Sequence, residues 1–218
     1  MTPAAHSAPK KITVKPMQLL TTIGTPDEVS GAVVSGKSII VFGTKASKAY
    51  ARAIDVTGKE LWNISLDQFA ASIATAAAVD SAGDIWIAGA TPLALGIVTP
   101  TPTATPINPD SAVIPPSTNV GNLQAVTIWK ISPTGTVLFT NTLPTSFVLF
   151  PTAISVDKNG ASVVGIVANG KGNAAFLANI DSAGAFSKLL QIGASSTTAD
   201  AVVRHPDGTI TVLSLIHI

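Results

Sequence analysis

Aspartates recur at comparable places along this 218-residue chain, and a cluster of carboxylates is the kind of group that binds calcium. Each of four aspartates begins a short turn that ends in glycine, namely Asp55, Asp80, Asp157 and Asp181. A calcium site needs about six to eight oxygen ligands, whereas each turn supplies one carboxylate, joined at Asp80 by Asp84. The sequence therefore predicts that each aspartate caps its own turn by accepting a hydrogen bond from an amide two residues further on.

The histidines form no pattern that indicates catalysis or metal binding. His6 lies near the start of the chain, His205 beside a turn and His217 next to the last residue. A histidine metal site needs several convergent ligands, and no His-x-His or His-x-x-x-His pair occurs. A Ser–His–Asp triad is recognised by geometry, so His205 remains open to one, but no Gly-x-Ser-x-Gly motif supports it. The absence of cysteine excludes disulfides and thiolate chemistry. We assign no catalytic, cofactor-binding or metal-binding residue, and no cofactor.

Three tryptophans are the remaining residues of chemical interest, because indole rings stack on sugars. Trp62, Trp86 and Trp129 fall in different strands of the predicted repeats, so they need not share a face. Packing in the core is the usual role of such side chains. No phosphate-binding loop of the Gly-x-x-x-x-Gly-Lys-Ser/Thr type occurs.

Composition narrows the class of protein. Hydrophobic residues make up 46% of the chain and charged residues only 11%, which excludes a disordered protein. With 13 basic and 12 acidic residues, the chain has no basic stripe for nucleic acid. A spanning helix needs about 20 consecutive apolar residues, and the longest candidate, 70–79, has half that length. The sequence therefore predicts no nucleic-acid partner and no membrane span.

Turn glycines reveal an internal repeat. One set of turns contains glycines at 36, 83, 160 and 208, separated by 47, 77 and 48 residues. A second set contains glycines at 58, 135 and 184, separated by 77 and 49 residues. Both sets indicate a period near 48 residues, with one repeat lengthened by a Pro- and Thr-rich stretch at 92–122. Because proline removes backbone donors, we expect this stretch to be a surface loop.

Each repeat reads as four short strands bounded by turn residues. In the second repeat the predicted strands are Ala74–Val79, Asp84–Ala90, Gln124–Ile131 and Thr136–Leu143. Residues 70–78 are alanine-rich enough for a helix, but their counterparts are rich in Val and Ile, which favours a strand. The segment Gln18–Gly24 is similar to Lys188–Gly193, the predicted fourth strand of the third repeat. The chain is thus expected to hold one strand, three full repeats and two further strands.

A four-stranded unit of this length in tandem is typical of a β-propeller. The runs from Val79 to Gly89 and from Ile54 to Trp62 resemble the bacterial β-propeller repeat called SBBP and, more loosely, quinoprotein-type propeller repeats. The resemblance covers 19–212 apart from the inserted loop. The later copies depart from it, with Val163 and Val164 in place of Ile-Trp and Arg204 in place of Asp. The resemblance implies an all-β, β-propeller-like array of about three full blades plus partial terminal blades.

The expected domain organisation has three parts. Residues 1–11 form a lead-in, residues 12–212 a partial propeller with the inserted loop 92–122, and residues 213–218 a non-native tail. Codons for Leu213–Ile218 can match the end of a common sequencing adaptor, so we expect the frame to be a fragment of a larger ring. A short apolar terminal strand is the alternative.

The expected function is a non-catalytic binding or scaffold propeller with a protein or carbohydrate ligand. The resemblance suggests an exported bacterial protein, placed at the cell surface, in the periplasm or outside the cell. The alternative is a fragment of a propeller enzyme, a quinoprotein-like dehydrogenase or a hydrolase, with its catalytic residues outside this chain. A third hypothesis makes the Pro92–Asn122 loop the recognition element, since long loops on rigid scaffolds often bind partners.

Overall fold

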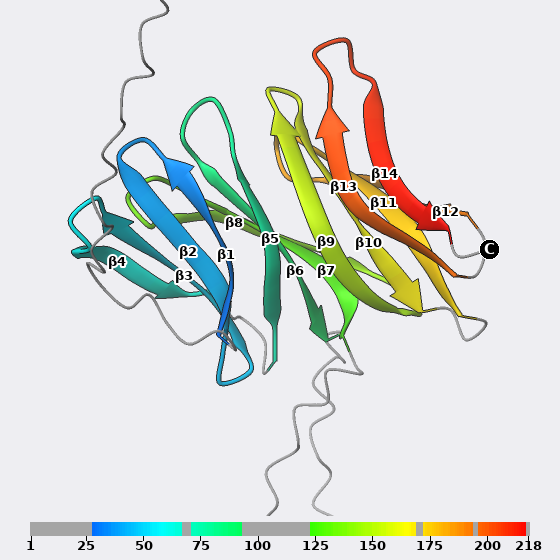
Figure 1. Ribbon diagram of the computed structural model, residues 1–218, viewed down its shortest axis with the longest axis horizontal. Coiled ribbons are helices and arrows are strands. Elements are labelled where there is room, and N and C mark those ends of the chain that lie inside the picture. The colour runs from blue at the N-terminus through cyan, green and yellow to red at the C-terminus, as the bar shows by residue number, and fades with distance from the viewer. Residues whose placement is uncertain (1–27, 67–70, 93–122, 169–171, 194–195, 217–218) are drawn as a thin grey trace, which may run out of the picture.

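The computed structural model describes residues 28–66, 71–92, 123–168, 172–193 and 196–216, and its regular structure there is entirely β-strand (Figure 1). The predicted lead-in 1–11 and the predicted strand Gln18–Gly24 lie outside the described residues. Among the described residues no helix is long and apolar enough to cross a membrane.

The strands form antiparallel sheets in which neighbours in sequence are neighbours in space. The first sheet contains β1 (Val29–Ser35), β2 (Ser38–Lys45), β3 (Lys48–Asp55) and β4 (Glu60–Ser65). The second contains β5 (Ile73–Val79), β6 (Ile85–Pro92), β7 (Leu123–Ile131) and β8 (Val137–Pro144). The third contains β9 (Val148–Asp157), β10 (Gly160–Ala168), β11 (Asn173–Asp181) and β12 (Phe186–Ile192). The fourth, as far as the structure describes it, pairs β13 (Thr197–Arg204) with β14 (Ile210–Ile216).

The predicted all-β class and four-stranded units are confirmed. Each strand of the second sheet begins and ends within two residues of its predicted bounds. The alanine-rich segment is strand β5, because its alternate side chains pack on β-branched and aromatic neighbours. The inserted loop starts one residue later than predicted, since Pro92 ends β6 opposite Leu123. Residues 93–122 lie outside the described part of the chain.

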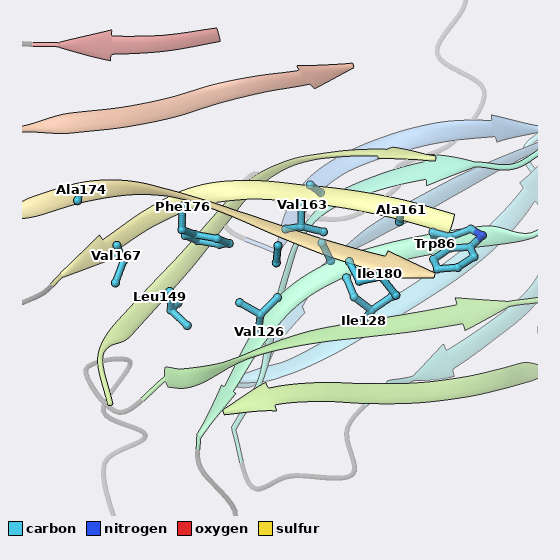
Figure 2. Packing of buried hydrophobic residues seen from close by; sticks show 13 residues of the cluster. Trp86, Val126, Ile128, Leu149, Ala161, Val163, Val167, Ala174, Phe176 and Ile180 are labelled. Carbon is cyan, nitrogen blue, oxygen red and sulfur yellow. The ribbon is translucent and has the colours of Figure 1, made fainter. Parts of the chain in front are cut away.

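The sheets stack face to face in an open row. Their first strands, β1, β5, β9 and β13, contact one another in succession, and the first and fourth sheets lie at opposite ends of the row (Figure 1). The first and second sheets enclose one apolar cluster, which includes Phe42 and Trp129. A larger cluster around Trp86 and Phe176 joins the second and third sheets (Figure 2).

Two ends of the stack differ in their connections. At one end, called here the turn end, tight hairpins follow every odd-numbered strand, and Figure 1 shows those after β5, β9 and β13 at the top. At the opposite end, called here the connection end, the chain passes from each even-numbered strand to the next, including from β6 to β7.

The predicted tail overlaps the last strand. Leu213 to Ile216 continue β14 and pair with β13, as the alternative of a terminal strand expected. Whether these residues are native is a property of the gene and stays a prediction. The last two residues, 217 and 218, lie outside the described part.

Candidate functional site

The recurring aspartates cap their own turns, as the sequence predicts. Asp55 Oδ1 accepts hydrogen bonds from the amides of Thr57 at 2.8 Å and Lys59 at 3.0 Å. Asp80 and Asp181 make the same pair of bonds, and Asp157 accepts one from Asn159. Within the described ranges no group of three or more His, Cys, Asp or Glu residues could hold a metal ion.

A half-buried ion cluster lies within the second sheet, near the turn end. Lys130 Nζ lies 3.1 Å from Asp80 Oδ2 and 3.1 Å from Asp84 Oδ2. The ammonium also lies 4.9 Å from the ring centroid of Trp86, and the Trp86 indole donates to Asp80 Oδ2 at 2.9 Å. The cluster therefore joins the β5–β6 hairpin to β7 through one lysine.

The cluster shifts the protonation equilibria of its members. Burial by itself raises the pKa of the Asp80 carboxyl, but hydrogen bonds from Trp86 and Lys130 outweigh burial and hold that pKa below its ordinary value. Burial lowers the pKa of Lys130, and its bonds to Asp84 and Asp80 outweigh that effect and raise it. Both pKa shifts favour the charged forms, so Asp80 and Lys130 are ionised at neutral pH.

A second cluster joins the third sheet to the fourth. Arg204 Nε lies 3.1 Å from Asp157 Oδ1, close enough for an ion pair although the N–H direction does not meet hydrogen-bond geometry. Arg204 Nη1 donates to Ser162 Oγ at 2.8 Å, and Ser162 Oγ donates to Asn179 Oδ1 at 2.8 Å. Burial raises the pKa of Asp157, but the contact with Arg204 and the bond from the Asn159 amide together outweigh burial and leave the pKa lowered.

Two recesses open at the connection end. One, of about 370 Å³, is lined by residues that include Glu28, Lys45, Tyr50, Arg52 and Asn63. The other, of about 450 Å³, is lined among the described residues by Gly172, Asn173, Ser196 and Thr198, which are uncharged. The first recess can offer cations to an anionic group, and the second can offer hydroxyl and amide groups to a neutral polar ligand.

Left-handed backbone at residues other than glycine is concentrated at the connection end. Among the described residues, Ala46, Ser47 and Ser196 have positive φ, at 48°, 65° and 70°. Ala46 and Ser47 form the two-residue turn between β2 and β3, and Ser196 precedes β13. Ala46 and Ser196 each line one of the two recesses. Two of the three positions with left-handed backbone thus line a concave surface.

The structure brings none of the tryptophans together into a shared sugar-binding face. Trp86 is 2% exposed and faces the third sheet, whereas Trp129 is fully buried against the first. Trp62 packs against the cluster between the first two sheets. Packing in the core, the role favoured by the sequence, is confirmed.

The side chain of His205 contacts a threonine in its own hairpin. Its Nε2 lies 2.9 Å from Thr211 Oγ1 on the neighbouring strand. His6 and His217 lie outside the described residues. This arrangement accounts for His205 as part of the β13–β14 hairpin.

Sequence reasoning missed Lys130 and Arg204 as organising residues. Lys130 is a charged residue inside the apolar run Leu123–Ile131, and Arg204 follows the apolar pair Val202–Val203. A charged side chain in an apolar strand needs an oppositely charged partner when it is buried. This pattern in the sequence could have identified both Lys130 and Arg204. The partner of Arg204 belongs to the preceding sheet, 47 residues earlier in the chain, so pairing required the fold.

Comparison with known proteins gives matches among solved structures alone. No family model and no curated protein matches this chain. A solved structure described as a protein of unknown function from Bacteroides caccae is similar, at 16% sequence identity and a TM-score of 0.43. The match covers 85% of this chain and 52% of that one, so the chain spans about half the length of that protein.

Proposed function

We propose that this chain is a non-catalytic binding or scaffold module with a propeller-type architecture. Support comes from consecutive four-stranded antiparallel sheets that stack face to face with their first strands side by side. That is the arrangement of blades in a β-propeller. The resemblance of the repeats to those of exported bacterial propellers supports a site of action at the cell surface or beyond it.

The observation that carries a binding role is the strain at the connection end. A non-glycine residue in the left-handed region costs about 1 kcal/mol or more. Three such residues lie in the connections of this one end, two of them lining a recess. Backbone strain of this kind concentrates at ligand-contacting positions, because other demands on the chain hold it there.

A neutral carbohydrate is the ligand class that fits the recess beside Ser196. The lining residues within the described part of the chain carry no charge and present the Asn173 amide and the hydroxyls of Ser196 and Thr198. These groups both donate and accept hydrogen bonds, as sugar hydroxyls do. We place the ligand there, at the end of the stack where the long connection from β6 to β7 also leaves the sheet.

The test is binding of the full chain to immobilised neutral and acidic polysaccharides. We expect a neutral polysaccharide to bind, and Asn173→Ala to weaken binding about tenfold, the loss of about 1.4 kcal/mol. Asn159→Ala is the matched control, since Asn159 is an exposed asparagine of the same sheet at the turn end. No binding to any neutral polysaccharide, or equal effects of the two substitutions, would contradict the proposal.

A further inference from the structure

The outer strand of one sheet docks on a turn of the next sheet at two places in the described stack. Trp62 of β4 donates its indole N–H to Pro133 O at 3.0 Å, in the turn between β7 and β8. Asn141 of β8 donates to Gly184 O at 2.8 Å, in the turn between β11 and β12. The first and second sheets thus each hold the following sheet through their fourth strands.

Glycine is required in both turns by this docking. Gly135 and Gly184 have φ values of 87° and 89°. A Cβ atom at Gly135 would lie 2.8 Å from the ring of Trp62 and 3.2 Å from Trp62 Cβ. A Cβ atom at Gly184 would lie 2.7 Å from the ring of Phe139. The outer strand therefore sits directly against the turn backbone.

The first sheet carries the same turn with no described sheet in front of it. The turn Asp55–Gly58 has the backbone hydrogen bonds of the other two, including Gly58 N to Asp55 O at 3.0 Å. Val56 in this turn is 70% exposed and Leu61 on the adjoining β4 is 49% exposed. The first sheet therefore has the same kind of turn on which the outer strands of the other sheets dock, and the apolar side chains beside this turn are exposed to solvent.

The recess beside β3 and β4 continues that surface. Ala49, Ala51 and Ala53 face the second sheet, so the alternate residues Tyr50 and Arg52 face away from it. Both line the recess of about 370 Å³. The outer face of the first sheet therefore has a turn to dock on at one end and a hollow at the other.

A segment of this chain has the sequence of an outer strand and the right distance from β1. Gln18–Gly24 is similar to Lys188–Gly193, which includes the end of the observed outer strand β12. Residues 193–196 separate β12 from β13, and residues 145–147 separate β8 from β9. Residues 24–28 would separate the segment from β1, a connection of five residues that lies between those two and the seven residues, 66–72, that separate β4 from β5.

We propose that residues 18–23 of this chain lie along the outer face of its first sheet as an outer strand. Sheet register places Trp62 opposite Ala53, Phe139 opposite Lys130 and Lys188 opposite Asn179. In this placement Gln18 is the structural equivalent of these outer-strand residues. It packs against Gly58 as Trp62 packs against Gly135. The segment covers Leu61 and runs on toward the recess.

Engineered cysteines test this placement cleanly, because the full chain contains none of its own. Gln18→Cys is combined with Gly58→Cys, since the matching Cβ positions at residues 62 and 135 lie 3.2 Å apart. The control combines Gln18→Cys with Gly208→Cys, where φ is also 86° and a Cβ would meet nothing within 4 Å. In a thiol–disulfide buffer we expect about tenfold more intramolecular disulfide in the first pair.

Each other outcome overturns the proposal. Equal disulfide in the two pairs, or none, would show that residue 18 does not dock on this turn. A disulfide that joins two chains, seen as a dimer on a non-reducing gel, would show that another copy supplies the strand. Hydrogen exchange of the unsubstituted full chain guards against damage by the cysteines. Amides of residues 18–23 should be protected, and exchange at the free-peptide rate would overturn the placement.

Discussion

Two neighbouring joints of the stack are built from different chemistry. Between the second and third sheets, large side chains such as Trp86, Ile128 and Phe176 interlock over a continuous apolar cluster (Figure 2). Between the third and fourth sheets, the fully packed residues are smaller, Val164, Ala175, Ala199 and Val202. Polar contacts between the third and fourth sheets add to this smaller apolar contact.

Polar contacts at the second of these joints come from both sheets. The Thr152 hydroxyl donates to Ala199 O, and the Arg204 amide donates to Ser155 Oγ at 3.1 Å. The Arg204 guanidinium adds the contacts with Asp157 and Ser162. The comparison teaches that one stacking geometry can be held by apolar burial or by ion pairing. We therefore expect the two joints to respond differently to truncation, pH and loss of charge.

Trp86→Ala should have the largest effect on stability. It removes a fully packed indole, its edge-to-face contact with Phe139 at 5.4 Å and a donor to Asp80. We expect a loss of about 4 kcal/mol in the free energy of unfolding. Val202→Ala, the matched truncation at the other joint, should cost about 1.5 kcal/mol. Urea titrations measure both, and equal losses would contradict the contrast between the joints.

Lys130→Met should cost about 2–3 kcal/mol at pH 7, because it leaves Asp80 and Asp84 without their shared cation. The lowered pKa of Asp80 contributes stability above the unfolded value, near pH 4, and that contribution is lost as pH falls through the folded pKa. The raised pKa of Lys130 contributes stability below about pH 10, lost as pH rises through its folded value.

The difference between wild type and Lys130→Met should therefore shrink below about pH 4. Urea midpoints at pH 7 and pH 3 check this. A difference that stays constant across this range would show that the cluster adds packing and no electrostatic stability.

Gly135→Ala should cost about 2 kcal/mol, less than the truncation of Trp86 or the replacement of Lys130. Part of the loss is the left-handed backbone of the turn, and part is the collision of the new methyl group with Trp62. Gly208→Ala has the same backbone conformation and open space around it, so it should cost only about 1 kcal/mol. Thermal denaturation compares the stability of the two variants. Equal losses would show that the contact with Trp62 does not contribute to the cost of Gly135→Ala.

Local features of the fold could be predicted from sequence, whereas its long-range partners could not. The Asp-x-x-Gly turns and the strand alternation depend on residues a few positions apart. The turn from Asp80 to Gly83 and its flanking strands could therefore be predicted. The hydrogen bond from Trp62 to the turn at Pro133 spans 71 residues and depends on how sheets stack. The left-handed backbone at Ala46, Ser47 and Ser196 could not be predicted either, because alanine and serine do not favour that conformation.

The most direct test of the difference between the joints is hydrogen exchange of wild type and Arg204→Met at neutral pH. The substitution keeps much of the side-chain bulk and removes the charge that holds the fourth sheet to Asp157. We predict that amides of β13 and β14 exchange about 30-fold faster, corresponding to about 2 kcal/mol, while those of β6, β7 and β10 are unchanged. Uniform acceleration across all four sheets, or no acceleration in β13 and β14, would contradict an ion-paired joint beside an apolar one.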